Sequence, residues 1–219
     1  MVEVSVSILN VKKENAIQTL YNLETSGIDY FHIDVMDGRF VKNNTLNQMI
    51  EYCEYLNQIT NIPLDVHLMV EDIKEGINKF AVFEPNIITF HLETAKNKKE
   101  VLDTIKLIKE NNCRVGISVK PNTKIEEIYE FLPYIHLVLI MTVEPGEGGQ
   151  KLIEETIQKI SELKKYISQN MLDVEIEADG GINTDNVDEL KDSGVDIIVS
   201  GSAIIGSNNY TETVNKLKK

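Results

Sequence analysis

The sequence predicts a single (β/α)₈ barrel of the TIM type, formed by residues 1–219, and three observations lead to it. Short apolar, β-rich runs alternate with longer amphipathic segments along the whole chain. The alternation repeats eight times, and no low-complexity tract or Pro/Ser-rich linker interrupts it. The length of 219 residues, of which 42% are hydrophobic, suits one well-buried core. Alternating strands and helices imply a parallel sheet with right-handed crossovers, and eight unbroken units favour a closed barrel.

Eight apolar runs predict the strands. In chain order they are Val4–Leu9, Tyr30–Asp34, Leu64–Leu68, Ile87–His91, Arg114–Val119, Leu137–Met141, Val174–Ala178 and Ile197–Ser200. A helix is expected after each strand, and apolar residues at helical spacing are clearest in Glu14–Glu24, Leu46–Asn57, Lys98–Glu110, Ile153–Ser168 and Asp185–Asp192. An open doubly wound sheet is the alternative. The first strand-to-helix turn, SILNVKKENA, contains no glycine and therefore no G-x-G-x-x-G phosphate-binding motif.

Composition narrows the class of partner. A net charge of -13 argues against nucleic acid or an anionic membrane, because both recruit a basic face. No run approaches the roughly 20 apolar residues of a membrane helix, and the N-terminus lacks the pattern of a signal peptide. Cys53 and Cys113 lie far apart and match no metal or redox spacing, so we expect reduced thiols in a cytoplasmic protein.

Polar side chains end three of the predicted strands, where the active site of this fold lies. In HIDVMDG, His32 and Asp34 are two residues apart on one strand and share a face. In LDVHLMV, His67 ends the next strand, with Asp65 two residues earlier on the same face. In IEADGGI, Asp179 closes the seventh strand before a pair of glycines. These side chains are therefore expected to meet at the mouth of the barrel.

Two imidazoles and two carboxylates from three strands can surround one divalent ion, and mixed nitrogen and oxygen ligands suit zinc, iron(II), manganese or cobalt better than magnesium. The alternative for any buried histidine is a hydrogen-bonded core residue. We apply that interpretation to His91 and His136, and favour the metal for His32 and His67 because each lies near an acid at the barrel mouth.

Glycine-rich segments follow the last three strands: EPGEGGQ, DGGI and SGSAI. Glycine permits close approach of the backbone, so main-chain amides here can converge on an anion, although any one pair read alone is typical of a turn. The loops after strands seven and eight are the usual phosphate position in this fold. The amides expected to bind the phosphate are those of Gly148, Gly149, Gly181, Gly201 and Ser202, and Gly146 and Gly180 are also expected to bind the substrate.

A metal beside two carboxylates, with a phosphate anchor opposite, suits a small phosphorylated keto-sugar. The metal would polarise the ketone and acidify the neighbouring carbon. Inverting that carbon requires one group to remove a proton from one face and another to return a proton to the opposite face. Asp34 and Asp179, on distant strands, meet that demand, so the predicted reaction is an epimerisation.

The segments HIDVMDG, LDVHLMV, MTVEPGEGGQ, EADGGI and SGSAI resemble the ribulose-phosphate 3-epimerase family over essentially the whole chain. The resemblance implies a barrel of the ribulose-phosphate-binding type that interconverts ribulose 5-phosphate and xylulose 5-phosphate with zinc, iron, manganese or cobalt. It implies a homo-oligomer, with Asp34 as proton acceptor and Asp179 as proton donor. It makes His32, Asp34, His67 and Asp179 the metal ligands, places both histidines and Ser7 near the substrate, and assigns Met36, Met69 and Met141 to a cap over the intermediate. The three methionines are equally typical of flexible core packing.

Two segments depart from the family pattern. This chain has MDGRFVKN where the family usually has MDGHFVPN, so Arg39 and Lys42 replace a histidine and a proline. It has EPGEGGQ where the family usually has NPGFGGQ, so Glu144 and Glu147 lie in the expected phosphate loop. An acid beside a dianion is unfavourable unless it points away or pairs with a cation such as Lys151 or Lys120. The departures affect the expected substrate more than the expected reaction.

Three alternatives remain at this stage. An allulose 6-phosphate 3-epimerase would keep the same metal and aspartates and act on a six-carbon ketose. A decarboxylase of the orotidine-phosphate type is disfavoured because its D-x-K-x-x-D motif is absent; the corresponding positions hold Asp65, His67 and Val70. A non-catalytic sugar-phosphate-binding barrel is compatible with the fold, but every residue that proton transfer needs is present.

Overall fold

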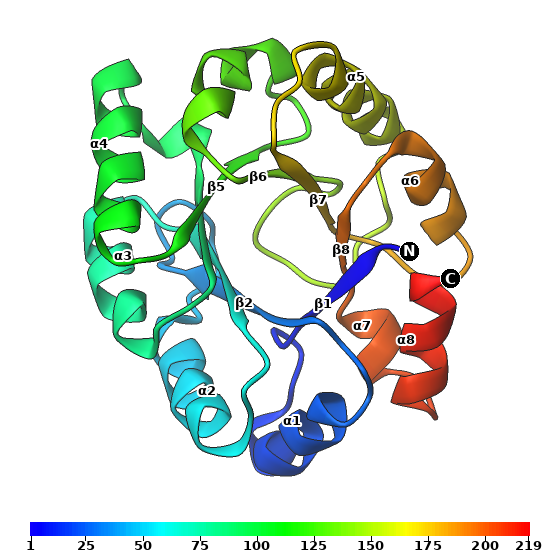
Figure 1. Ribbon diagram of the computed structural model, residues 1–219. Helices are drawn as coiled ribbons and strands as arrows, with labels where there is room; N and C mark the ends of the chain where they lie inside the picture. Colours follow the sequence, from blue (N-terminus) through cyan, green and yellow to red (C-terminus); the bar gives the residue numbers. More distant parts are fainter.

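A computed structural model describes residues 1–219 and contains a closed barrel of eight parallel strands in the order β1 to β8 (Figure 1). The strands are β1 Glu3–Ser7, β2 Tyr30–Met36, β3 Leu64–Met69, β4 Ile87–His91, β5 Arg114–Val119, β6 Leu137–Met141, β7 Glu175–Asp179 and β8 Ile197–Val199. The predicted (β/α)₈ barrel is confirmed, with all eight strands within two residues of their expected ends.

Helices surround the barrel in a single outer ring (Figure 1). They are α1 Ala16–Glu24, α2 Leu46–Ile59, α3 Ile73–Phe80, α4 Lys98–Glu110, α5 Glu155–Gln169, α6 Val187–Ser193, α7 Ser202–Ile205 and α8 Tyr210–Lys218. The expectation of one α-helix after each strand was wrong in two places. Residues 125–134 form a 3₁₀ helix after β5, and both α7 and α8 follow β8. Pro133 lies within the 3₁₀ segment, and its missing N–H and fixed ring oppose a regular α-helix there.

The main hydrophobic core lies between the strands and the helices, since strand residues that point outward pack against the apolar helix faces. The interior of the barrel is partly polar. It contains the fully or almost fully buried side chains Ser5, His32, Asp65, Thr89, Ser118 and Glu177. Polar groups are costly to bury without partners. The buried polar side chains under the barrel mouth therefore indicate a functional site at this end of the barrel.

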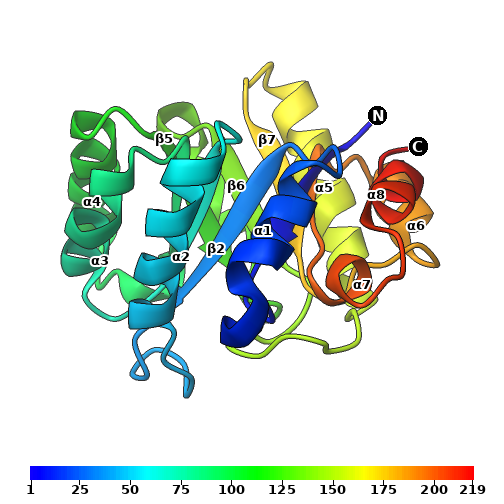
Figure 2. The same ribbon diagram turned by 90° about the horizontal axis from the view of Figure 1, so that it is seen from below.

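The register between strands decides which polar residues meet. On β2 and β3, His32 lies opposite Asp65 and Asp34 lies opposite His67. The carboxyl ends of the strands lie at the lower edge of the molecule in Figure 2, together with the loops after β2 and β6. There the side-chain amide of Asn43 donates to the carbonyl oxygen of Gly146 at 2.7 Å. The termini lie at the opposite edge, and none of the helices has the length and apolar character to cross a membrane.

Candidate active site

Four side chains meet at the barrel mouth: His32 and Asp34 from β2, His67 from β3 and Asp179 from β7. One candidate ligand atom from each lies within 4.8 Å of those of the other three. Both histidines are fully buried, and the side chains of Asp34 and Asp179 are 6% and 14% exposed. The strands bring together the four residues that their spacing predicts should converge.

The distances within this cluster fit a divalent metal. Asp34 Oδ1 lies 3.5 Å from His32 Nε2 and 3.7 Å from His67 Nδ1. Asp179 Oδ2 lies 3.8 Å and 3.6 Å from the same two nitrogen atoms. Ligand atoms about 2.1 Å from a tetrahedral zinc lie roughly 3.4 Å from one another. Both nitrogen atoms are buried without a hydrogen-bond partner, as expected of atoms whose partner is an ion. This buried His/Asp group could therefore hold a metal.

The contact made by His32 Nδ1 decides which of the two ring nitrogens is available to a metal. Its Nδ1 lies 2.5 Å from Oδ2 of Asp65, which also accepts a hydrogen bond from the hydroxyl of Ser5 at 2.9 Å. An ionised carboxylate only accepts, so Nδ1 carries a proton and Nε2 is the nitrogen that can present a lone pair toward the two aspartates when the ring is neutral. Carboxylate, imidazole and metal commonly stand in this order in metal sites.

The charges of the cluster are also matched to a cation. Burial by itself lowers the pKa of His32, but the carboxylates of Asp65 and Asp34 outweigh burial and raise this pKa well above its ordinary value. The pKa of His67 is raised in the same way, against burial, by hydrogen bonds to Asp179 and Asp34. Protons and a metal therefore compete for the same two nitrogen atoms, and acid should favour release of a metal.

Glu177 lies beneath this cluster on β7 and is fully buried, and neither carboxyl oxygen has a hydrogen-bond partner. Burial and the neighbouring Asp65 raise the pKa of Glu177 well above its ordinary value. Burial raises the pKa of Asp65, but His32 outweighs burial and lowers this pKa; the Nδ1 of His32 lies 2.5 Å from Asp65 Oδ2 and 3.8 Å from Glu177 Oε1.

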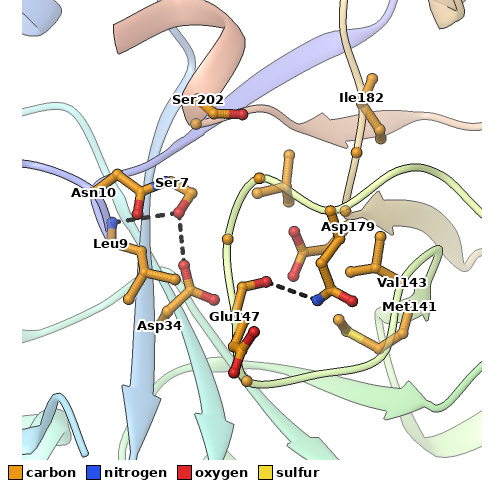
Figure 3. Close-up of a pocket in the computed structure, with 18 of the residues that line it drawn as sticks. Ser7, Leu9, Asn10, Asp34, Met141, Val143, Glu147, Asp179, Ile182 and Ser202 are labelled. Carbon is orange, nitrogen blue, oxygen red and sulfur yellow. Dashed lines mark hydrogen bonds between the residues drawn. The ribbon is translucent and has the colours of Figure 1, made fainter. Parts of the chain in front are cut away.

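A pocket opens above the cluster, and Figure 3 shows Asp34 and Asp179 on opposite sides of it. Asp34 uses its other oxygen, Oδ2, to accept a hydrogen bond of 2.7 Å from the hydroxyl of Ser7 on β1. The carboxylate of Asp34 is thus oriented by one partner while Oδ1 faces the histidines. The predicted residues that line the pocket are Ser7, Asp34, Met36, Met69, Met141, Gly146, Gly148, Gly149, Asp179, Gly180, Gly181, Gly201 and Ser202.

The glycines of the pocket wall are required by close packing at two positions. A Cβ atom at Gly201 would lie 2.9 Å from the carbonyl oxygen of Ser7. Gly181 has φ +70°, and a Cβ atom there would lie 2.4 Å from the backbone nitrogen of Leu152. No lysine or arginine lines the pocket, so an anion in it would be bound mainly by main-chain amides and hydroxyls.

The acidic loop makes no ion pair with Lys151 or Lys120. Glu144 accepts a 3.5 Å hydrogen bond from the side-chain amide of Asn122. Glu147 is exposed and lines the pocket, and its carbonyl oxygen accepts from the side chain of Gln150 (Figure 3). An unpaired acid therefore remains at the pocket rim.

Some positions differ from what sequence reasoning pointed to. His32 and His67 do not line the pocket, because they lie behind the aspartates with no exposed surface. Asn10 lines the pocket and was missed, although it stands three residues after Ser7 in the first strand-to-helix loop. His91 is fully buried with both ring nitrogens at hydrogen-bond distance from His67 and Glu93, which confirms the interpretation as a hydrogen-bonded core residue.

Fold and site define the class of protein: a (β/α)₈-barrel enzyme with two aspartates and two buried histidines clustered at its mouth. Residues 3–205 match the ribulose-phosphate 3 epimerase family model. The chain therefore belongs to the ribulose-phosphate 3-epimerase family.

Curated relatives are similar in sequence to this protein over most or all of its length. A ribulose-phosphate 3-epimerase of Bacillus subtilis is 35% identical over 219 residues, covering 100% of this chain and 99% of the relative. One from Methanocaldococcus jannaschii is 34% identical, covering 100% and 91%, and one from Helicobacter pylori is 40% identical over 193 residues, covering 88% and 87%. Among solved structures, KGPDC from Streptococcus mutans has a TM-score of 0.73 at 12% identity, covering 100% of this chain and 96% of that chain. At that identity the last likeness concerns the fold alone.

Proposed function

We propose that this chain is a metal-dependent ribulose-phosphate 3-epimerase that interconverts D-ribulose 5-phosphate and D-xylulose 5-phosphate. The observation that carries the proposal is the placement of Asp34 and Asp179 on opposite sides of one pocket, beside two buried histidine nitrogens that have no hydrogen-bond partner. The names of the curated relatives support the same activity. A homo-oligomer is part of the proposal, and light scattering tests it.

The proposed ligands of one divalent metal are His32, Asp34, His67 and Asp179, and zinc, iron(II), manganese and cobalt suit this donor set. When bound, such a metal supplies the positive charge that acidifies the carbon beside a ketone. The two carboxylates and two imidazoles of this cluster form a mixed nitrogen and oxygen donor set.

The two aspartates carry the proton transfers in this proposal. Asp34 removes the proton from the third carbon of ribulose 5-phosphate, and Asp179 returns a proton to the opposite face of the planar enediolate. The hydroxyl of Ser7 holds Asp34 in position through Oδ2. Met36, Met69 and Met141 line the same pocket, and in this proposal they shield the intermediate from water.

The phosphate of the substrate is proposed to bind on the glycine-rich side of the pocket, at the amides of Gly181, Gly201 and Ser202 and of the loop after β6. Glu147 at the rim is the specific observation that favours a second candidate, a 3-epimerase for allulose 6-phosphate. A carboxylate there disfavours a closely placed dianion, and a longer ketose would place its phosphate differently.

The test is epimerisation of both ketose phosphates by the metal-loaded protein in deuterium oxide, with incorporation at the third carbon followed by NMR. We expect strong preference for ribulose 5-phosphate. Preference for the hexulose would shift the assignment to the second candidate, and no exchange with either would contradict the proposal.

Single substitutions separate the two proton carriers. Asp179→Asn should still exchange the third-carbon proton of ribulose 5-phosphate through Asp34, without forming xylulose 5-phosphate. Asp34→Asn should show the reverse pattern with xylulose 5-phosphate. Metal content is measured for each variant, because both aspartates are also proposed ligands. Near-normal inversion by either variant would remove that residue from the mechanism.

A further inference from the structure

His91 connects the candidate metal cluster to a second layer of polar groups. It ends β4, next to β3, and is fully buried. Its Nε2 lies 3.0 Å from Nε2 of His67, and the two rings stack with their centroids 5.0 Å apart. Its other nitrogen, Nδ1, lies 3.1 Å from Oε2 of Glu93. His91 therefore bridges a candidate metal ligand and a carboxylate.

The carboxylate of Glu93 sets the direction of each hydrogen bond in the series from Glu93 through His91 to His67. Glu93 accepts at Oε1 from the amide of Lys120 at 2.7 Å and from the hydroxyl of Thr123, so it acts as an ionised acceptor. His91 must then donate to Glu93 through Nδ1 and, as a neutral imidazole, accept at Nε2. His67 must donate to His91 through Nε2.

These hydrogen bonds determine which ring nitrogen of His67 faces the aspartates. With its proton on Nε2, its Nδ1 presents a lone pair, and this is the buried nitrogen that has no hydrogen-bond partner. It lies 3.6 Å from Asp179 Oδ2 and 3.7 Å from Asp34 Oδ1. The opposite tautomer would place a proton between the aspartates and leave no lone pair for a cation.

The turn after β5, which donates hydrogen bonds to Glu93, is itself held in place by a lysine. The ammonium group of Lys159, on α5, donates to the carbonyl oxygens of Lys120, Pro121 and Thr123 at 3.0, 2.6 and 2.7 Å. This fixes the turn after β5 that supplies two donors to Glu93. The arrangement from α5 to His67 is thus a continuous series of hydrogen bonds.

We propose that His91 and Glu93 are positioning residues that hold the Nδ1 lone pair of His67 toward Asp34 and Asp179, and so set the affinity of the site for a divalent metal. The proposal rests on the metal ligands of the proposed function and goes beyond them, because neither residue faces the pocket or the ion. Partners of this kind typically change metal affinity by about 10- to 100-fold.

The chain offers a matched control in His136. This histidine directly precedes β6, at the opposite end of the barrel, where its Nδ1 accepts from the amide of Val115 at 3.0 Å. It has no contact with the metal cluster. His91→Phe removes the two ring-nitrogen hydrogen bonds of His91, and His136→Gln alters the one hydrogen bond of His136 at the opposite end of the same barrel.

The experiment measures Co²⁺ affinity by competition with a chelator, together with the visible spectrum of the Co²⁺-loaded protein. His91→Phe and Glu93→Gln should each weaken Co²⁺ binding by about 10- to 100-fold and alter the spectrum. His91→Gln should restore binding to within about threefold of the parent, because its carbonyl oxygen can accept from His67 Nε2–H. His136→Gln should match the parent.

Two results would overturn the proposal: parent-like Co²⁺ affinity in both His91→Phe and Glu93→Gln, or equal losses in His91→Phe and His91→Gln. If His91→Phe fails to fold, the Glu93→Gln measurement decides. His67→Phe separates this proposal from the metal site itself. Tight Co²⁺ binding in His67→Phe would refute the proposed ligands, whereas loss there and retention in the His91 and Glu93 variants would refute the positioning role alone.

Discussion

Replacing Glu93 with glutamine should lower the free energy of unfolding at neutral pH. Burial raises the pKa of Glu93, but the hydrogen bond and charge of His91, the amide of Lys120 and the hydroxyl of Thr123 outweigh burial and lower the pKa from 4.5 to about 2. A tenfold change in proton affinity corresponds to about 1.4 kcal/mol, so the ionised carboxylate contributes at most about 3 kcal/mol at pH 7. Glutamine keeps the shape and one acceptor, so we expect a loss of about 1–3 kcal/mol.

The pH dependence of this loss has a definite sign. A carboxylate with a lowered pKa in the folded state stabilises the protein above its unfolded pKa of 4.5 and loses that effect as the pH falls toward about 2. The difference between parent and Glu93→Gln should therefore be constant above about pH 5.5 and fall to less than half near pH 3. The side chain of Glu93 is only 21% exposed, so screening by solvent is limited.

The assay is urea unfolding followed by far-ultraviolet circular dichroism at pH 7, 5 and 3, with chelator present so that metal binding does not contribute. Glu127→Gln is the control, since Glu127 is exposed and has no ion-pair partner; its effect should stay within about 0.5 kcal/mol. A pH-independent difference for Glu93→Gln, or none at pH 7, would refute the reasoning.

Three other predictions concern the metal, the thiols and the pocket wall. Chelation should abolish epimerisation and a divalent metal should restore it; full activity in a rigorously metal-free sample would contradict the proposed site. Burial raises the pKa of Cys53 to about 12 and also raises that of Cys113, so a thiol reagent at pH 8 should label neither within minutes in the folded protein and both after unfolding; rapid labelling of native Cys53 would refute its burial. Gly201→Ala places a Cβ atom 2.9 Å from the carbonyl oxygen of Ser7, so it should cost about 1–3 kcal/mol of stability and raise KM, as steady-state kinetics and thermal unfolding would show; a parent-like KM would argue against phosphate at this wall.

Local sequence patterns were sufficient for the barrel and for most of the candidate site. Alternation with period two put His32 and Asp34 on one face of a strand, and the glycine pair after Asp179 marked the end of another. The same reasoning failed after β5, where the helical pattern of residues 125–134 forms a 3₁₀ helix around Pro133. It could not place Asn10 in the pocket, because loop conformation depends on contacts with distant segments such as Gly148.

The sequence by itself determined the alternation of strands and helices and the polar residues at the strand ends. Both follow from side-chain periodicity and from turn residues that are close together in the sequence. Only the tertiary structure decided which nitrogen of each histidine is free. That depends on partners such as Asp65 for His32, and His91 with Glu93 for His67, which lie on other strands or beyond them. Strand register and barrel closure set those distances, and no local pattern encodes them. His91 and His136 are both histidines beside a predicted strand, but the fold places one against a candidate metal ligand and the other at the far end of the barrel.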